Sequence, residues 1–163
     1  MGRWTPLASE SGIRHDTEGA VVNVNNLQLP EAYTALASKH QASGGFCNLR
    51  LAGEHDAFGN FLETELAQIY IDEFELAAKT KQLNEYFALD GCYGESAIES
   101  SHPGAIADIT DFTKIVCFGM AADGSQFCFD FREDKAAPSV IWWDDDCWRK
   151  ISNDFEEFIS LFL

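Results

Sequence analysis

Three consecutive aspartates, Asp144, Asp145 and Asp146, are the sharpest chemical feature of the sequence. Adjacent carboxylates can bind Mg²⁺ or Ca²⁺, but a calcium loop needs alternating ligands and a glycine at its bend, which this run lacks. A catalytic carboxylate pair is a second interpretation, although adjacent side chains at a hairpin tip would splay apart. A solvated turn, in which aspartates accept hydrogen bonds from their own backbone, is a third. We predict no metal site and no catalytic site here, and keep open a surface that meets basic side chains of a partner.

Three tryptophans lie close to this acidic run, at positions 142, 143 and 148. Because side chains alternate across a strand, Trp142 and Trp143 must face opposite sides of a sheet. Core packing is the simpler role for them, but an exposed tryptophan beside carboxylates is typical of a binding hot spot. The charged connection before this strand adds two further carboxylates. The candidate partner-binding residues are therefore Asp144, Asp145, Asp146, Glu133, Asp134 and Trp143.

A polar stretch at residues 90–111 contains the other residues that could do chemistry, among them Ser96, Ser100, Ser101 and His102. No GxSxG elbow surrounds any of these serines, and nothing in the sequence holds a base near a nucleophile. A solvated surface loop explains the stretch more simply than a hydrolase does. The chain also lacks a phosphate-binding glycine loop, an HExxH motif and a dinucleotide fingerprint. We therefore expect no enzyme activity and no cofactor.

The charge balance is the one unusual property of the composition, with 27 acidic residues against 11 basic ones and a formal net charge of −16. Such a chain repels nucleic-acid phosphates and anionic membrane surfaces, so we expect neither as a partner. A basic protein would instead be attracted to it. The alternative is that the acidic surface only keeps the protein soluble.

The cysteines and apolar runs indicate a cytoplasmic protein. Five cysteines form an odd set without CxxC spacing, which favours reduced thiols over a disulfide framework or a zinc site. No apolar run approaches the ~20 residues that span a bilayer. The first residues contain no apolar segment of the kind found in secretory signals.

The order of patterns predicts one α+β domain with a mainly antiparallel sheet of about four to six strands. Helices are expected near residues 30–41, 72–87 and 153–162, where Pro30 opens the first, Asp72 caps the second and Asn153 caps the third. Residues 1–28 are expected to form an irregular N-terminal arm, although Asn25-Asn26 marks a turn there. Residues 29–163 then form the domain.

The last third of the chain carries the clearest strand signals. Residues 115–120 are apolar on both faces, as in a buried central strand. In residues 125–131 the phenylalanines alternate with Gln126, Cys128 and Asp130, so the strand has an aromatic core face and a more polar second face. Asp123-Gly124 supplies the hairpin turn between them, within a loop longer than two residues. Strands 140–143 and 147–151 follow.

These elements resemble the SUKH superfamily, which includes fungal regulators of cell-wall synthesis and bacterial immunity proteins. The residues that carry the resemblance are Leu29-Pro30-Glu31-Ala32-Tyr33 with Gly44-Gly45, the strands Ile115–Gly119 and Phe127–Asp130, the run Trp142–Asp146 and the terminal helix around Phe155 and Phe158. The resemblance covers residues 29–163. The sequence departs from the family pattern at residues 1–27, where the usual N-terminal helix cannot be recognised. It departs again at residues 88–111, a stretch that is longer and more polar than the pattern requires.

The resemblance implies an α+β fold without catalytic activity. In the bacterial branch it implies a small cytoplasmic protein, a monomer or weak dimer, that binds and neutralises a cognate protein toxin with a basic surface, often a nuclease. A regulatory scaffold domain, as in the fungal branch, is the second hypothesis. A hydrolase that uses His102 is the third.

Overall fold

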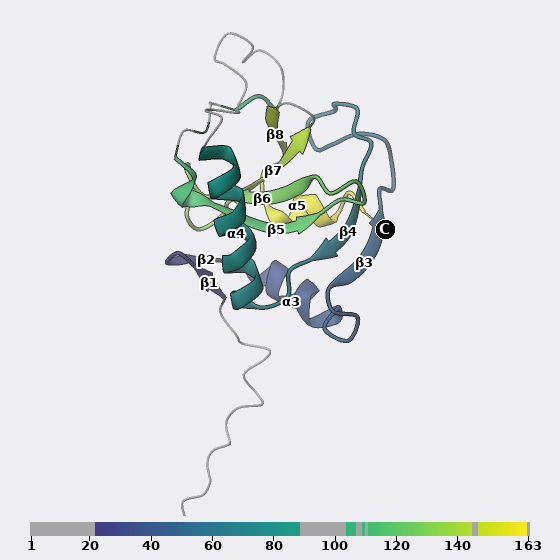
Figure 1. Ribbon diagram of the computed structural model, residues 1–163. Coiled ribbons are helices and arrows are strands. Elements are labelled where there is room, and N and C mark those ends of the chain that lie inside the picture. The colour runs from purple at the N-terminus through teal and green to yellow at the C-terminus, as the bar shows by residue number, and fades with distance from the viewer. Residues whose placement is uncertain (1–21, 89–103, 107–108, 110, 145–146, 163) are drawn as a thin grey trace, which may run out of the picture.

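The computed structural model describes residues 22–88, 104–106, 109, 111–144 and 147–162 (Figure 1). Within them lies one six-stranded sheet whose neighbouring strands are all antiparallel and follow the order of the chain. Its strands are β3 (Phe46–Arg50), β4 (Glu65–Ile69), β5 (Ile115–Met120), β6 (Gln126–Asp130), β7 (Ser139–Asp144) and β8 (Cys147–Ser152). The predicted α+β fold with an antiparallel sheet is thus confirmed.

Helices cover both faces of this sheet. Figure 1 shows α4 (Glu73–Ala88) in front of the sheet and α5 (Phe155–Ile159) behind it, with α3 (Glu31–Lys39) below. On the α4 side, Thr80 Oγ1 accepts a hydrogen bond of 3.0 Å from the backbone N–H of Cys117. The more polar second face of β6 is therefore not a solvated surface, since Cys128, opposite Cys117 in the register, is fully buried. A short 3₁₀ helix, η2 (Phe112–Lys114), leads into β5.

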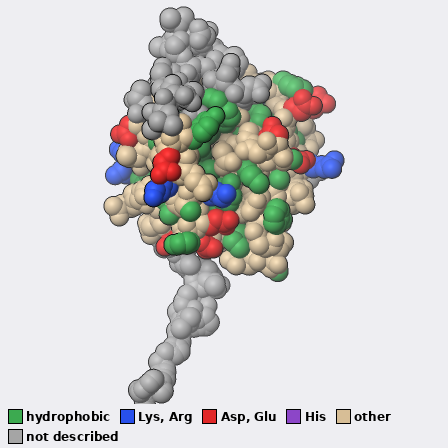
Figure 2. All heavy atoms as spheres, in the orientation of Figure 1, with side chains coloured by type: hydrophobic (Ala, Val, Ile, Leu, Met, Phe, Trp, Pro, Cys, Tyr) green, Lys and Arg blue, Asp and Glu red, His purple; other side chains and the backbone are tan. Residues whose placement is uncertain are grey.

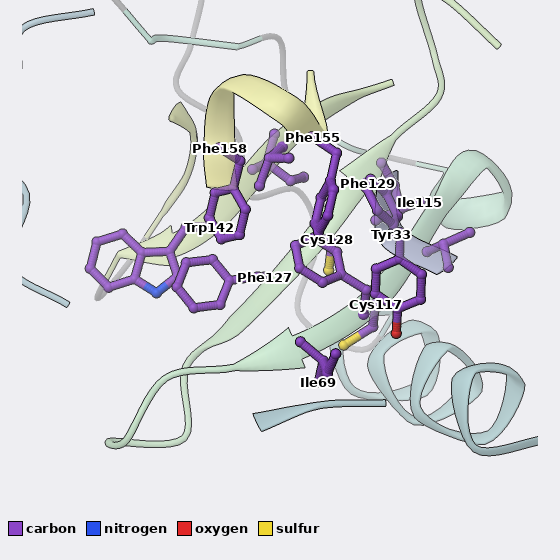
Figure 3. Packing of buried hydrophobic residues seen from close by; sticks show 14 of the residues in the cluster. Tyr33, Ile69, Ile115, Cys117, Phe127, Cys128, Phe129, Trp142, Phe155 and Phe158 are labelled. Atoms are coloured by element: carbon purple, nitrogen blue, oxygen red, sulfur yellow. The ribbon is translucent and has the colours of Figure 1, made fainter. Parts of the chain in front are cut away.

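The core on the α5 side is built from aromatic rings. Figure 3 shows Phe155 and Phe158 of α5 directed toward Phe127 and Phe129 of β6. The ring centroids of Phe127 and Phe158 are 5.3 Å apart, and those of Phe129 and Phe155 are 5.5 Å apart. Tyr33 of α3 joins them by an edge contact with Phe129 at 5.7 Å. The alternating phenylalanines of β6 therefore do form the predicted aromatic core face.

Two residues of the run Leu29-Pro30-Glu31-Ala32-Tyr33, an LPxxY motif, hold α3 against the sheet. Pro30 occupies the N-cap position with an extended backbone, φ −61° and ψ 147°, which proline's ring favours. Tyr33 is buried, and its hydroxyl donates a hydrogen bond to the carbonyl of Tyr70 at the end of β4. A buried hydroxyl and a buried carbonyl that satisfy each other avoid the cost of leaving either unpaired. The tyrosine of the motif thus has a structural role.

Glycines of the same pattern allow the backbone to approach β4 closely. Gly45 has φ +97°, and a Cβ there would collide with the carbonyl oxygen of Ile69. A Cβ on Gly119 would lie 2.7 Å from the carbonyl oxygen of Gln68. Side chains at these two positions would push β4 away from its neighbours.

The helix ends match the predictions unevenly. Asp72 caps α4, because its carboxylate accepts a hydrogen bond of 2.7 Å from the N–H of Glu75. The predicted cap Asn153 of α5 is wrong by one residue. Asp154 is the N-cap, and its carboxylate accepts a hydrogen bond of 2.8 Å from the N–H of Glu157. The Glu157 carboxylate in turn accepts one from the N–H of Asn153. The reciprocal arrangement predicted for this helix exists, shifted by one position.

The two ends of the described chain add short pairings outside the six-stranded sheet. β1 (Asn23–Val24) and β2 (Leu27–Gln28) form a hairpin across Asn25 and Asn26, both with positive φ. These residues fall inside the predicted arm 1–28, of which residues 1–21 lie outside the described residues. After α5, Leu161 accepts a hydrogen bond from the N–H of Ala52, and Phe162 forms a bridge with Leu51 beside β3. The terminal helix is therefore shorter than the predicted 153–162.

Candidate functional site

The structure separates the predicted partner-binding residues along β7. Trp143 and the backbone of Asp144 lie at its last residues, whereas Glu133 and Asp134 lie in the loop that precedes its first residue, Ser139. A strand rises about 3.3 Å per residue, so the two ends of β7 are roughly 17 Å apart. Asp145 and Asp146 lie outside the described residues. We call the first region, with the turn 121–125, the hairpin end, and the second, residues 130–139, the loop end.

At the hairpin end, Trp142 and Trp143 face opposite sides of the sheet, as strand alternation requires. Trp142 is only 6% exposed and stacks on Phe127 with ring centroids 6.1 Å apart (Figure 3). Trp143 is partly buried and packs against Trp148 at 5.4 Å. Trp142 therefore packs as a core residue, and Trp143 is partly buried against the core from the other face.

The turn between β5 and β6 fixes the polar edge of Trp142. Its Nε1–H donates a hydrogen bond of 2.8 Å to Ser125 Oγ, and that hydroxyl donates one of 2.7 Å to Asp123 Oδ1. The same oxygen accepts a hydrogen bond of 2.9 Å from the Ser125 N–H, and Gly124 takes the positive φ that closes the turn. Hydrogen bonds to the ionised form hold the pKa of Asp123 below its usual value. Asp123 is therefore a carboxylate anchored beside a tryptophan.

Arg149 on β8 completes the wall beside Trp142. Its guanidinium carbon lies 5.7 Å from the Trp142 ring centroid, within the range of a cation–π contact. One guanidinium nitrogen donates a 2.9 Å bond to the carbonyl of Phe61 and lies 3.6 Å from the buried carboxylate of Asp56. Asp56 in turn accepts hydrogen bonds from the N–H groups of Phe58 and Asn60. The positive charge is thus matched by a negative one inside the protein.

These residues surround an open cavity of about 580 Å³. That volume lies within the range typical of ligand sites. Phe61, at its rim, is 59% exposed, and Glu63 is exposed as well. Its lining includes Phe61, Glu63, Asp123, Trp142, Trp143 and Arg149. We refer to it as the aromatic cavity.

A second cavity of about 320 Å³ lies against α4, and Trp143 lines both cavities. Its other walls include Tyr70, Trp148 and Tyr86, whose side chain is 64% exposed. Lys79 of α4 lies 5.4 Å from the Tyr70 ring centroid. The surface seen in Figure 2 carries acidic and basic side chains mixed among hydrophobic ones, not one acidic patch.

At the loop end, acidic side chains serve the fold. Asp130 is 7% exposed and accepts two hydrogen bonds of 2.9 Å from Arg132, one from Nε and one from a terminal guanidinium nitrogen. Asp134 accepts hydrogen bonds from the N–H groups of Ala136 and Ala137, as aspartates often do in turns. A cavity of about 270 Å³ here is lined by Asp130 and Glu133 but also by Arg132 and Lys150. Carboxylates and cations are balanced in this cavity.

The sequence singled out Trp143 at the hairpin end but not Phe61, Glu63 or Arg149. Phe61 and Glu63 belong to a loop without periodicity, and only the long-range pairing of strands brings them to the tryptophans. Asp123 was visible only as a turn residue. A correct prediction of the pairing Phe127↔Trp142 would have revealed the site, since this pairing places the β5–β6 turn next to the end of β7.

The described residues contain no group of three or more His, Cys, Asp or Glu side chains that could hold a metal ion. Cys47, Cys117 and Cys128 are free thiols, and burial raises the pKa of Cys128 well above its usual value. His102 of the hypothetical hydrolase lies outside the described residues. Among the helices that the structure describes, none has the length and apolar character needed to span a bilayer.

An antiparallel meander covered by helices on both faces, with open cavities at its strand ends, defines an α+β protein in which Tyr33, Gly45 and Gly119 have structural roles. Residues 23–161 match the SMI1 / KNR4 family (SUKH-1). The chain belongs to this family, and the resemblance to the SUKH superfamily is confirmed. No curated protein and no solved structure gives a significant match.

Proposed function

We propose that this chain is a bacterial immunity protein that binds a cognate protein toxin stoichiometrically and neutralises it in the cytoplasm of the cell that makes it. The observation that carries the proposal is membership of the SUKH-1 family over residues 23–161, in a chain with a net charge of −16. The family is known for immunity and regulatory proteins and is generally non-catalytic. The toxin is then inhibited by occupation of a surface, without chemistry on it.

Charge favours a toxin with a basic surface, such as a nuclease whose substrate groove attracts phosphates. An acidic protein meets such a surface at a rate raised by electrostatic steering. Because salt screens charges over a Debye length of about 10 Å at 0.1 M, association should slow as salt is added. At the hairpin end the exposed ring of Phe61 offers aromatic contact area beside the carboxylates of Glu63 and Asp123.

A regulatory scaffold domain is the alternative within the same family. Such a domain would bind a cellular partner and leave no toxic activity to neutralise. The two functions differ in a measurable consequence of binding, which is the survival of cells that express a toxin.

Co-expression with the toxin encoded by the adjacent gene tests the proposal. Growth should be restored, and the purified pair should elute as a complex of fixed stoichiometry. The His102→Ala variant is the matched control, because a binding protein protects equally well without this histidine whereas a hydrolase would not. The absence of both a complex and growth rescue would refute the immunity function.

A further inference from the structure

The aromatic cavity at the hairpin end combines flat rings with carboxylates in a way that the loop end does not. We propose that it is the slot that receives an arginine side chain projecting from the partner protein. The identification of that partner as a toxin rests on the proposed function, but the preference for a guanidinium group is a property of the cavity alone.

The charges that line the cavity favour a cation. Glu63 and Asp123 contribute two carboxylates, and Arg149 contributes the one cationic group of the lining that the structure describes. The side chain of Arg149 is 12% exposed and lies 3.6 Å from Asp56, which is itself buried. Its charge is therefore matched within the protein, and an incoming cation meets an excess of negative charge. The same excess of negative charge would repel an incoming carboxylate.

The rings favour a planar cation. Arg149 already shows the geometry, with its guanidinium 5.7 Å from the Trp142 centroid. Trp142 is 6% exposed, with Phe127 and Arg149 against its ring, so the lining ring open to a partner is Phe61, which is 59% exposed. Guanidinium stacks on aromatic faces and forms paired hydrogen bonds with carboxylates, whereas the ammonium of lysine is more strongly hydrated and acts as a point charge. Arginine should therefore bind better than lysine.

The walls of the cavity are held in place before any partner arrives. Trp142 stacks on Phe127 and is tied by Nε1 to Ser125, whose hydroxyl is in turn bonded to Asp123. Side chains that are already ordered lose little conformational entropy on binding. The cavity of about 580 Å³ is larger than a single arginine side chain requires, so it also admits the backbone that carries that side chain.

The loop end has the opposite character. Its cavity of about 270 Å³ pairs Asp130 and Glu133 with Arg132 and Lys150, and no aromatic residue lines it among those described. It offers neither an excess of negative charge nor a stacking surface. This end supplies the matched control for the experiment.

The test is a titration of the full-length, ¹⁵N-labelled protein with N-acetyl-arginine methylamide, followed through the indole N–H signals of Trp142 and Trp143. The expected result is a saturable shift of these signals with a dissociation constant on the order of 1 mM, as a ligand of this size permits. N-acetyl-lysine methylamide should bind more weakly, and the norleucine analogue should leave the signals unchanged. Equal shifts with all three probes, or a shift only with N-acetyl-glutamate methylamide, would overturn the proposal.

Two double variants with the same change of charge locate the site. Glu63→Gln/Asp123→Asn should weaken binding of the arginine probe about fivefold, the effect of losing two exposed charge contacts. Glu133→Gln/Asp134→Asn should leave it unchanged. In Asp123→Asn the amide oxygen can still accept the hydrogen bonds from Ser125. If the double variant folds poorly, the single variant Glu63→Gln, at an exposed position, replaces it in the test. Equal binding by the two double variants refutes the site.

Measuring how well the same two double variants bind and neutralise the toxin separates the arginine slot from the immunity function. If the toxin is bound and neutralised equally well by both double variants, the immunity function stands and the arginine slot is refuted as its contact. If the arginine probe binds as described but no toxin is neutralised, the slot stands and the immunity function is refuted.

Discussion

The two ends of β7 hold carboxylates that have different roles. At the loop end, Asp130 lies buried against Arg132, and Asp134 closes a turn through its backbone bonds. At the hairpin end, Asp123 and Glu63 line an open cavity with tryptophans and a phenylalanine. Both ends are acidic in sequence, but only the hairpin end combines an excess of negative charge with aromatic rings.

This difference shows that an acidic composition is a poor guide to a binding surface by itself. A buried carboxylate bound to an internal cation, such as Asp130, contributes to folding and has less to offer a partner. A carboxylate beside exposed rings can contribute to both attraction and contact area. All six candidate residues remain predictions: Asp144, Asp145, Asp146, Glu133, Asp134 and Trp143. Among those whose side chains the structure describes, Trp143 is the one at the hairpin end, with Glu63 and Asp123.

Phe127→Ala should produce the largest loss of stability, because Phe127 joins the aromatic core to Trp142. Loss of a fully buried ring should lower the free energy of unfolding by about 3–5 kcal/mol, measured by urea denaturation. It should also loosen Trp142 and weaken binding of the arginine probe. Phe129→Ala is the matched control, since Phe129 is equally buried but packs on Tyr33 and Phe155. If both variants weaken probe binding equally, the cavity does not depend on the Phe127–Trp142 contact.

Asp130→Ala should be the next largest change and should affect the loop end alone. It leaves Arg132, whose side chain is only 25% exposed, without its bidentate partner, so the free energy of unfolding should fall by about 2–3 kcal/mol. Thermal and urea denaturation both measure this loss. Asp130→Asn, which keeps one acceptor oxygen, should lose less. A change in affinity for the arginine probe in either folded variant would contradict the independence of the two ends.

Ser125→Ala should have a smaller effect, confined to the hairpin end. It removes the acceptor of the Trp142 Nε1–H and one of the two hydrogen-bond donors of Asp123. The expected cost is about 1 kcal/mol in the free energy of unfolding. The Trp142 indole N–H signal should move and exchange faster with water, whereas the signal of Trp143 should change little. An unchanged Trp142 signal would show that the serine does not hold the ring.

The sequence predicted the elements better than it predicted the site. Regular alternation identified β6 and its aromatic face, and the Asp72 cap and the Asp123-Gly124 turn are local signals read within a few residues. The cap of α5 was misplaced because Asn153 and Asp154 are both good capping residues, and the packing of Phe155 and Phe158 decides between them. The aromatic cavity depends on residues 61, 123, 142 and 149, which only the pairing of distant strands brings together.

The pH dependence of folding stability that comes from Asp123 should be the smallest effect. Hydrogen bonds from the N–H and the hydroxyl of Ser125 lower the pKa of Asp123 in the folded protein. Its contribution to stability is then fully present above the unfolded pKa, near 4, and is lost as the pH falls through the folded pKa. An NMR titration of the Asp123 carboxyl carbon measures the folded pKa directly.

Ser125→Ala provides the control for this titration. It removes the hydroxyl donor but keeps the backbone N–H, so the pKa of Asp123 should rise part of the way toward its usual value. Asp123→Asn should abolish the corresponding part of the acid sensitivity of folding, because the amide does not titrate. If Asp123 titrates at its usual value in the wild-type protein, the serine does not anchor the carboxylate. Asp123 would then not be ordered before a partner arrives, although Glu63 and Asp123 would still supply negative charge to the aromatic cavity.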